Sequence, residues 1–363
     1  MRNPETGWSL SPFDPSSEEA AALWRSLAAA CGGSLVQQPE FVFTCVETLG
    51  NGPLRLAVHR RDGRVNAAAL VSQRPGVPEV FVEDQMPLGA WLQLPSEDVI
   101  VLARSLLKKL PIGLRLGISQ LDSRFVPRPP TDDGVSTLDY IVTPWVDLEG
   151  SYDAYWAARG KNLRTNMRKQ RDKLTATGVP LRMEILSEAA DMARAVGDYA
   201  ALESKGWKAA GGTAVSEEHP QIRFYRRMLE RFAALGQARV YRYFFGEQLV
   251  ASELCLRGGG EFVILKTTYD ESTAPYSPAS LMRQEMFERL FAEGDVRRVE
   301  FYGPLKDWHT RWTPNQREVY HVNVFSSGAV GRLARIVRPA GGRAAEAAEL
   351  PAARASGESR AAD

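Results

Sequence analysis

Hydrophobic and polar positions along the first 150 residues follow two different periods, which predicts a domain that mixes helices and strands. The expected elements are a helix after Ser16 that stops at Gly32-Gly33, a hairpin of strands 54–58 and 65–71, a helix over 99–109 and a strand over 114–118. The hairpin rests on the Asp62-Gly63 pair, which is typical of a tight turn between strands. We therefore expect residues 1–150 to form a complete α/β domain.

The second half of the chain repeats this order of elements. The pattern predicts helices over 189–202 and 222–235, strands over 238–245, 248–256 and 262–269, a helix from Ala279, and strands over 298–301 and 319–325. The two halves show no clear sequence similarity, so an internal duplication is inferred from the order alone. The expected fold class is α/β of the α+β kind. Each of its two domains is expected to hold a mixed, mostly antiparallel sheet flanked by helices.

Residues 151–178 are predicted to be a basic helix that connects the two domains. Its charges are Arg159, Lys161, Arg164, Arg168, Lys169, Arg171 and Lys173 against Asp153 and Asp172. Leu163, Met167 and Leu174 supply a thin apolar edge. Either the helix forms an electropositive wall for an acidic ligand, such as the phosphates of coenzyme A or tRNA, or it is a solvated helix with one packed edge. The second domain is expected over 179–325, and residues 326–363 lack core-forming residues and are predicted to be a disordered tail.

Composition narrows the class of protein. The 363 residues are 44% hydrophobic and 25% charged, with a formal net charge of +1, so no overall field draws the chain onto nucleic acid or an anionic membrane. Three scattered cysteines argue against a disulfide framework, and four histidines without ligand spacing give no metal signal. The first residues lack the apolar region of a signal peptide, and no apolar run is long enough to span a bilayer. We expect a cytoplasmic protein without a membrane span.

Residues 269–281 read as the end of a strand, a loop and the start of a helix. Ser277 is a good N-cap, and Pro278 suits the first helical position, where its missing N–H costs nothing. The backbone amides near Ala279, Ser280 and Leu281 are then expected to be free at the positive end of the helix dipole, a geometry that binds phosphate. The alternative is an ordinary capped helix.

Four blocks together resemble a known family: 155–171, 203–208, 269–281 and 301–312. They are similar to the CelD-like acetyltransferases, a branch of the GNAT acyltransferase superfamily related to the FemAB aminoacyl transferases, and the resemblance covers about residues 152–325. It implies two GNAT-like domains and a loop-to-helix step that cradles the pyrophosphate of coenzyme A. Acyl-CoA is then a co-substrate, with no tightly bound cofactor. The implied donor-binding residues are Tyr276, Ser277, Ala279, Ser280, Leu281 and Arg283.

Transfer of an acyl group to an amine needs positioning, a general base and an oxyanion donor, but no protein nucleophile. Cys255 lies in an apolar strand and is interpreted as a structural thiol. Glu203 is the first candidate base, and His309 is the second. His309 belongs to a cluster with Asp307, Trp308, Arg311 and Trp312, and a strand here would place Asp307, His309 and Arg311 on one side. Either His309 titrates near neutrality and relays a proton, or it is a lone surface histidine. Members of the family often carry a lysine where His309 falls, which leaves its role open.

Six residues are expected to contact substrate: Trp207, Lys208, Glu253, Lys266, Tyr269 and Asp270. Trp207 and Lys208 follow Glu203 closely. Glu253 and Lys266 are charged residues within strand patterns, so they form an ion pair, contact substrate or lie on an exposed sheet face. Asp270 and Tyr276 flank the predicted phosphate loop.

The sequence thus predicts an acyl-CoA-dependent N-acyltransferase. Its acceptor is an amine on a small molecule, a sugar or a peptide. Two alternatives stay open. A FemAB-type peptidyl transferase would take its amino acid from aminoacyl-tRNA, and the near-neutral charge argues against this nucleic-acid partner. A non-catalytic relative would serve as a partner in polysaccharide biosynthesis or export.

Overall fold

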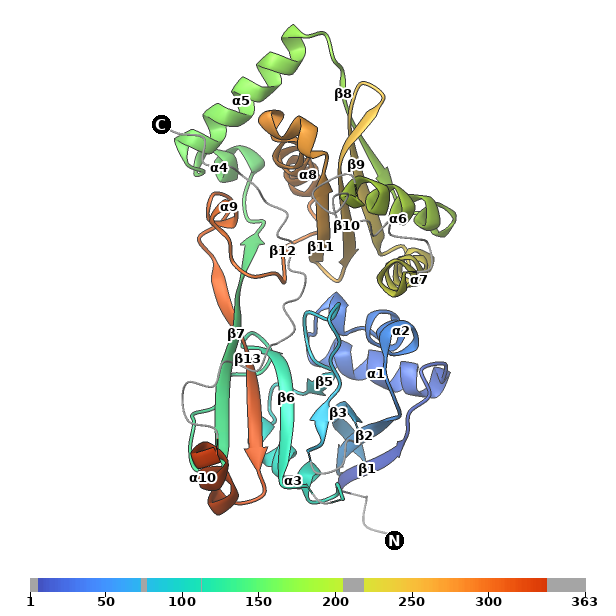
Figure 1. The fold of residues 1–363 in the computed structure, drawn as a ribbon, viewed down its shortest axis with the longest axis vertical. Coiled ribbons are helices and arrows are strands. Elements are labelled where there is room, and N and C mark those ends of the chain that lie inside the picture. The colour runs from blue at the N-terminus through green and yellow to red at the C-terminus, as the bar shows by residue number, and fades with distance from the viewer. Residues whose placement is uncertain (1–5, 73–76, 112, 205–218, 338–363) are drawn as a thin grey trace. The chain divides into compact units, whose positions relative to one another are not determined.

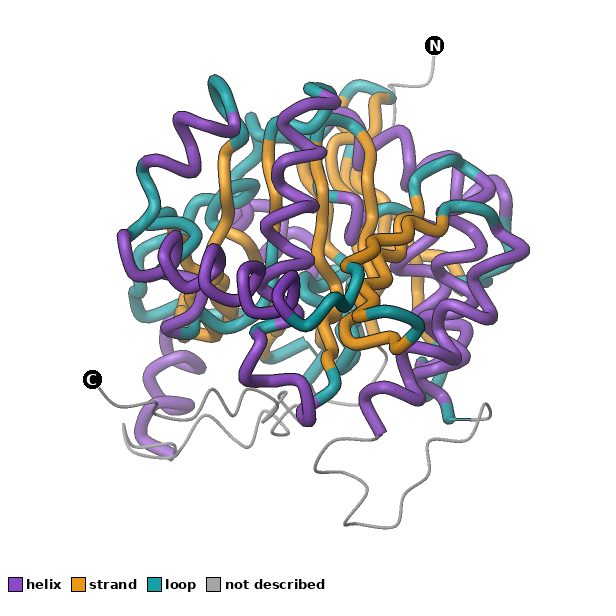
Figure 2. Tube along the Cα trace, turned by 90° about the horizontal axis from the view of Figure 1, so that it is seen from above, coloured by secondary structure: helices purple, strands orange, loops and turns teal. Residues whose placement is uncertain are grey.

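The computed structural model describes residues 6–72, 77–111, 113–204 and 219–337, and it divides into two compact units (Figure 1). The first unit contains the described residues up to Thr143 together with those from Arg317 to Val337. The second unit is Pro144–Gln316. In both units helices lie against strands, as Figure 2 shows in purple and orange. No helix in the described ranges is long and apolar enough to cross a membrane.

The first unit contains the predicted helices and hairpin. Its elements are β1 (Gly7–Pro12), α1 (Glu18–Ala30), η1 (Leu35–Gln37), α2 (Pro39–Leu49), β2 (Leu54–Arg61), β3 (Arg64–Ser72), β4 (Glu79–Val80), β5 (Trp91–Gln93), α3 (Val99–Leu107), β6 (Arg115–Asp122), the start of β7 (Val135–Asp147), β13 (Gln316–Phe325) and α10 (Gly328–Val337). The β2–β3 turn has positive φ at both Asp62 and Gly63, 52° and 78°, as the Asp-Gly pair predicts.

The second unit begins with the end of β7. It continues with α4 (Tyr152–Ala157), α5 (Lys161–Ala176), β8 (Leu181–Leu186), α6 (Ala189–Ser204), α7 (Pro220–Ala234), β9 (Ala238–Phe245), β10 (Gln248–Gly258), β11 (Glu261–Tyr269), η3 (Glu271–Tyr276), α8 (Pro278–Glu293), β12 (Arg298–Glu300) and α9 (Asp307–Thr310). The sequence missed β8 and β7 and predicted the other strands of this unit, β9 to β12.

The two sheets have the same topology. In the first unit the strand order is β1-β2-β3-β4-β6-β13, followed by β7, and in the second it is β8-β9-β10-β11-β12-β7. Each sheet contains one parallel pair, β4 with β6 and β11 with β12. The pairs β1–β2, β2–β3, β3–β4, β6–β13, β8–β9, β9–β10, β10–β11 and β7–β12 are antiparallel. Each parallel pair is joined through a helix, α3 or α8. The duplication predicted from element order is therefore present in the strand pairing.

Each half of the chain supplies a strand to the other half's sheet. The end of β7 pairs with β12 through Trp145, Val146 and Asp147, and β13 pairs with β6, for example Val322 with Ile118. The predicted boundaries at residues 150, 178 and 325 do not describe these units, because β13 belongs to the first sheet. Periodicity predicts that a segment is a strand, but it does not predict which strand it joins.

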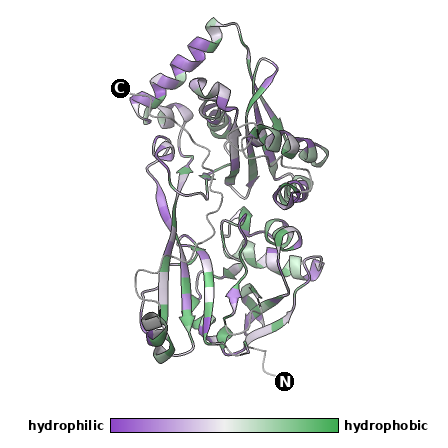
Figure 3. Cartoon of the chain, viewed as in Figure 1, coloured by the Kyte–Doolittle hydropathy of each residue, from purple (hydrophilic) through white to green (hydrophobic). Residues whose placement is uncertain are grey.

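The connecting segment is two helices rather than one. α4 ends at Ala157, and α5 begins after Gly160, whose extended backbone (ψ 141°) interrupts the helix. The apolar edge is confirmed: Leu163, Met167 and Leu174 are buried in the core of the second unit with residues of β9, β11 and α8. The opposite side of α5 is hydrophilic (Figure 3), with Lys161, Arg164, Arg168, Lys169 and Lys173 exposed.

The predicted tail is also partly ordered. Residues 328–337 form α10, and Arg332 pairs with Asp133 at 2.6 Å. A Cβ at Gly331 would lie 1.8 Å from the carbonyl oxygen of Asp133, so only glycine permits this close approach. The prediction of disorder from residue 326 was wrong for this helix, because charged and small residues hid a short amphipathic element. Residues 338–363 lie outside the described ranges.

Candidate active site

In the second unit, the parallel strands β11 and β12 separate after three paired residues. They pair only at Glu261 with Arg298, Phe262 with Val299 and Val263 with Glu300. β12 then ends, whereas β11 continues to Tyr269 paired with β10 alone. The sheet therefore divides here, and the chain after β12 runs as an irregular segment, 301–312, that includes the short helix α9.

The helix start after β11 forms as predicted, but its amides are not all free. Ser277 is the N-cap of α8 and Pro278 is its first residue, as expected. The Ser277 side chain makes no capping hydrogen bond, and its backbone is left-handed at φ 54°. The N–H groups of both Ser280 and Leu281 donate to the Ser277 carbonyl at 3.0 Å, so the prediction that they are free was wrong. The N-cap carbonyl accepts the first helical bond, which leaves the N–H of Ala279 as the open one of the three.

Asp270 fixes the loop that leads to this helix. Its Oδ1 accepts hydrogen bonds from the Ser272 N–H at 2.9 Å and the Ser272 hydroxyl at 2.6 Å, and its Oδ2 accepts one from Gln248 Nε2 at 3.0 Å. The Tyr276 ring packs edge-to-face on Phe245 with centroids 6.1 Å apart. Both side chains therefore shape the loop, and Tyr269, the last residue of β11, is half-buried beside it.

Glu253 and Arg283 form a buried ion pair. Glu253 is 0% exposed and Arg283 3% exposed, and Arg283 Nη2 donates to Glu253 Oε1. The same oxygen accepts from the Thr267 hydroxyl at 2.9 Å. This pair corrects two predictions. Arg283 is buried in the domain rather than presented to the donor phosphates, and Glu253 pairs with Arg283 rather than with Lys266 or solvent.

Three aromatic rings surround the Arg283 guanidinium. Its carbon lies 4.4 Å from the ring centre of Trp308, and 5.9 Å from those of Phe301 and Trp312. Distances below about 6 Å permit cation–π attraction. All three rings come from the 301–312 segment, so this segment packs around the guanidinium of Arg283, which extends from α8 into the core.

Glu203 and Lys266 lie on the opposite face of the sheet. Lys266 follows Leu265 in β11, and its Nζ lies 5.8 Å from the ring centre of Tyr225 in α7. Its neighbour Thr267 points to Glu253, because successive residues of a strand face opposite sides. Glu203, near the end of α6, hydrogen-bonds the buried Tyr199, and burial and then the charge of Glu203 raise the pKa of Tyr199. The predicted site residues are thus divided between the α6–α7 face and the α8 face.

His309 is a buried neutral histidine. It is 4% exposed, stacks on Trp308 at 3.6 Å between ring centres, and its Nδ1 accepts the Lys306 N–H at 3.0 Å. Burial, and then the positive charge of Arg283, lower the pKa of His309 to about 3. The prediction that it titrates near neutrality was therefore wrong. The ring proton belongs on Nε2, which makes His309 a hydrogen-bond donor rather than a base.

The region of Asp307 is a helix and not a strand. Residues 307–310 form α9, so the side chains of Asp307, His309 and Arg311 do not share one side as predicted, since a helix turns by about 100° per residue. Asp307 is exposed in the first turn of α9, where its carbonyl accepts the Thr310 hydroxyl at 2.7 Å. A four-residue helix is too short for its pattern to be recognised in the sequence.

The described part of the second unit matches a known family. Residues 161–312, from α5 to the end of the aromatic segment, match the family described as an acetyltransferase (GNAT) domain. Residues 161–312 are a GNAT acetyltransferase domain. The predicted membership of the GNAT superfamily is confirmed, and the site built above lies within the matched range of this transferase domain.

Solved structures support the fold of the whole chain. FemX is 11% identical, covers 91% of this chain and 99% of its own, and superposes with a TM-score of 0.57. A conserved protein of unknown function from Bacteroides thetaiotaomicron VPI-5482 is 9% identical, covers 87% and 99%, and has a TM-score of 0.53. At these identities the likeness concerns the fold alone. No curated protein matches the sequence significantly.

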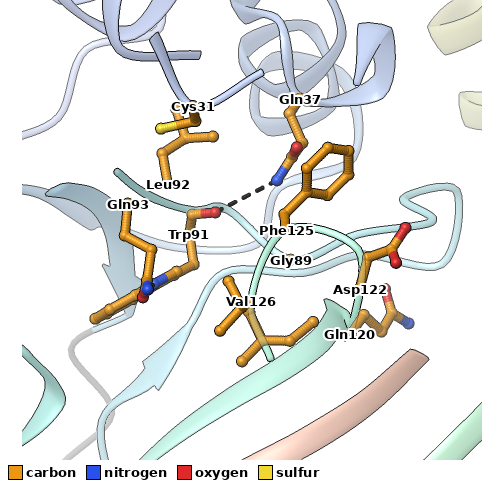
Figure 4. A pocket seen from close by; sticks show the side chains of 11 residues that line it. Cys31, Gln37, Gly89, Trp91, Leu92, Gln93, Gln120, Asp122, Phe125 and Val126 are labelled. Carbon is orange, nitrogen blue, oxygen red and sulfur yellow. Dashed lines mark hydrogen bonds between the residues drawn. The ribbon is translucent and has the colours of Figure 1, made fainter. Parts of the chain in front are cut away.

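A small cavity lies in the first unit, outside the GNAT domain (Figure 4). Its volume of about 10 Å³ is room for one water molecule. Gln37 Nε2 donates to the Trp91 carbonyl across it at 3.4 Å, and burial raises the pKa of Cys31 to about 11, so this thiol is not a nucleophile. The cavity is lined by Cys31, Gln37, Gly89, Trp91, Leu92, Gln93, Gln120, Leu121, Asp122, Phe125 and Val126. None of the predicted site residues lines it.

The sequence missed the partners that give the GNAT domain its polar interior. Tyr199 and Thr267 were not singled out, although each contacts a predicted residue. Trp308 and Trp312 were grouped with His309, but not as neighbours of Arg283. One signal was available: Arg283 follows Met282 and precedes Met286 on the buried side of α8, and such a charge requires a buried partner. Trp207 and Lys208 lie outside the described residues.

Proposed function

We propose that the GNAT domain transfers an acyl group from acyl-CoA to an amine on a small molecule, a sugar or a peptide. The amine nitrogen attacks the thioester carbonyl, the C–S bond breaks, the thiolate leaves with the coenzyme, and a base takes the proton of the amine. The observation that carries this proposal is the start of α8, which follows β11 within a GNAT domain, beyond the point where β11 loses its pairing with β12. The donor phosphates would lie at this helix start.

The duplicated fold offers an internal comparison for the donor site. α3 and α8 hold equivalent places, each between the strands of a parallel pair. At the start of α3, the Asp98 carboxylate accepts from the N–H groups of Ile100 at 2.7 Å and Val101 at 3.0 Å. At the start of α8, Ser277 makes no side-chain cap, and Ala279 keeps an open N–H. A carboxylate already occupies the anion position at α3, which supports donor binding at α8 and a stoichiometry of one donor per chain.

The division of the sheet brings donor and acceptor sides together. A donor held at α8 would pass its thioester between the ends of β11 and β12 and present it to the α6–α7 face. Glu203 and Lys266 lie on that face, beside Tyr199 and Tyr225. We assign the role of base to Glu203, since the Nδ1 atom of His309 already accepts a hydrogen bond. The His309 Nε2–H remains a donor, and Asp307 is left without an assigned proton transfer.

One observation favours transfer from aminoacyl-tRNA as a second candidate. Five basic side chains are exposed on α5, against one acidic side chain, Asp172. Such a row could contact a phosphate backbone, and its binding would weaken steeply with added salt. The overall charge of +1 does not add to this attraction.

Native mass spectrometry of the purified protein, followed by calorimetric titration with acetyl-CoA and longer acyl-CoA thioesters, tests the proposal. We expect one CoA species bound per chain. Binding of tRNA that falls with salt, without CoA binding, would move the function to the second candidate. Failure to bind CoA thioesters at millimolar concentration and tRNA alike would favour a non-catalytic partner in polysaccharide biosynthesis or export.

A further inference from the structure

Arg283 and Glu253 form a buried ion pair that joins two elements of the fold. Arg283 is on α8, and Glu253 is on β10, the strand next to β11. Two of their atoms, Arg283 Nε and Glu253 Oε2, are buried and make no hydrogen bond in the described residues. Since buried charges are tolerated when each compensates the other, removal of either partner leaves an uncompensated charge.

Arg283 also contacts residues 301–312, the segment that follows β12. Phe301 lies at the start of this segment, Trp308 in α9 and Trp312 at its end, and all three rings face the same guanidinium. The Arg283 charge acts on His309 as well, because it contributes to the lowering of the pKa of that ring. A neutral His309 keeps Nδ1 free of a proton, which is required for it to accept the Lys306 N–H.

We propose that Arg283 is a positioning residue that, fixed by Glu253, holds residues 301–312 against α8, so that the donor-binding helix and the segment beside the parted strands are ordered together. Its planar guanidinium contacts the rings while one Nη binds the carboxylate. A lysine ammonium would keep the charge but lose this planar contact. The effect on turnover rests on the proposed function, whereas the ordering of the segment does not.

Hydrogen–deuterium exchange on the full chain tests the ordering directly. In Arg283→Lys we expect exchange across 301–312 to rise by about tenfold or more, with exchange in β8 and β9 unchanged. The matched control is Arg171→Lys. Arg171 pairs with Glu285, also on α8, at 3.0 Å, but it is 34% exposed and has no ring around it. Unchanged exchange across 301–312 in Arg283→Lys, or an equal rise in Arg171→Lys, would overturn the proposal.

A second measurement separates positioning from general loss of structure. The double variant Arg283→Met, Glu253→Gln removes both charges together and so avoids a lone buried charge. We expect exchange across 301–312 to rise in this variant as in Arg283→Lys, since both lose the guanidinium that contacts the rings, while exchange in β8 and β9 stays unchanged. Unchanged exchange across 301–312 in the double variant, or an equal rise in β8 and β9, contradicts the proposal.

Turnover completes the comparison. If the proposed function is right, Arg283→Lys lowers kcat more than it changes donor affinity, because the substitution disturbs residues 301–312 rather than the donor-binding start of α8. If wild-type protein neither binds nor uses acyl-CoA, the proposed function fails, yet the exchange results still decide the positioning role.

Discussion

Glu203 is the residue on which the proposed proton transfer depends. We expect Glu203→Gln to lower kcat by roughly 10² or more with donor affinity preserved, because the amide keeps the shape of the side chain but cannot accept a proton. The measurement is the pH–rate profile with the true substrates, in which the acidic limb should disappear. His309→Gln is the control. Loss of the acidic limb in that variant alone would assign the base to His309.

His309 predicts a dependence of stability on pH. Its pKa is about 3 in the folded protein against 6.5 for a free histidine, so below pH 6.5 the unfolded chain binds a proton that the folded protein does not. The contribution of His309 to the free energy of unfolding is therefore fully present above pH 6.5. It is lost as the pH falls towards 3, by at most about 1.4 kcal/mol per pH unit.

The comparison of wild type with His309→Asn isolates this effect from the carboxylates. Asparagine can accept the Lys306 N–H through its side-chain oxygen without titrating. Urea unfolding between pH 4.5 and 7 should show a steeper loss in the wild type, from about pH 6.5 downwards. Parallel curves for the two proteins would show that His309 is protonated alike in folded and unfolded chains.

At the residue scale, the sequence predicted positions better than partners. Glu253, Lys266 and His309 were singled out by their residue types, but burial and contacts decided what each does. Arg283 joined the donor set through the family resemblance, and the structure instead gives it Glu253. Such pairs join β10 to α8, 30 residues apart in the sequence, and local pattern does not encode them.

At the scale of elements, the two equivalent helix starts provide a direct test of the donor site. Ser280 and Val101 are both the third residue of their helices, α8 and α3. Ser280→Asp should stabilise the fold by about 0.3–1 kcal/mol, because a negative charge suits a helix N-terminus. It should also weaken CoA binding by on the order of tenfold, since the same charge repels the pyrophosphate.

These opposite signs exclude unfolding as the cause of weaker binding. Val101→Asp is the matched control: Val101 is 61% exposed, and its helix start is already occupied by Asp98. Calorimetric titration should find wild-type CoA affinity in Val101→Asp. Equal losses in the two variants, or none in Ser280→Asp, would remove the donor from α8.

Long amphipathic elements could be predicted at this scale because burial of one face imposes a period on the sequence. α6, α7 and the strands β9 to β11 follow that rule. Short or interrupted elements did not. α9 has only four residues, and α4 and α5 are separated by a bend at Gly160. In α8 the N–H groups of Ser280 and Leu281 already donate to the Ser277 carbonyl, so they are not the free donors that the sequence predicted.

At the scale of the whole molecule, the exchanged strands predict which fragments fold. A fragment 179–325 lacks the end of β7, the partner of β12, and carries β13 without β6. A fragment 144–316 keeps the end of β7 and omits most of β13. We expect circular dichroism and urea titration to give cooperative unfolding for 144–316 and none for 179–325, because a missing or unpaired strand leaves open sheet edges. The reverse order would contradict the division of the chain described above.

The exchange also sets an order of events during synthesis. The chain leaves the ribosome from its amino end, and in the first sheet the strand between β6 and β7 is β13, which is made after the entire second unit. Until β13 is made, β6 and β7 lack the strand that pairs between them, and their backbone hydrogen-bonding groups are exposed. The first half of the protein is thus the last to be completed. A ribosome that stalls within the second half leaves a nascent chain with an open sheet, ready to pair with the wrong strand.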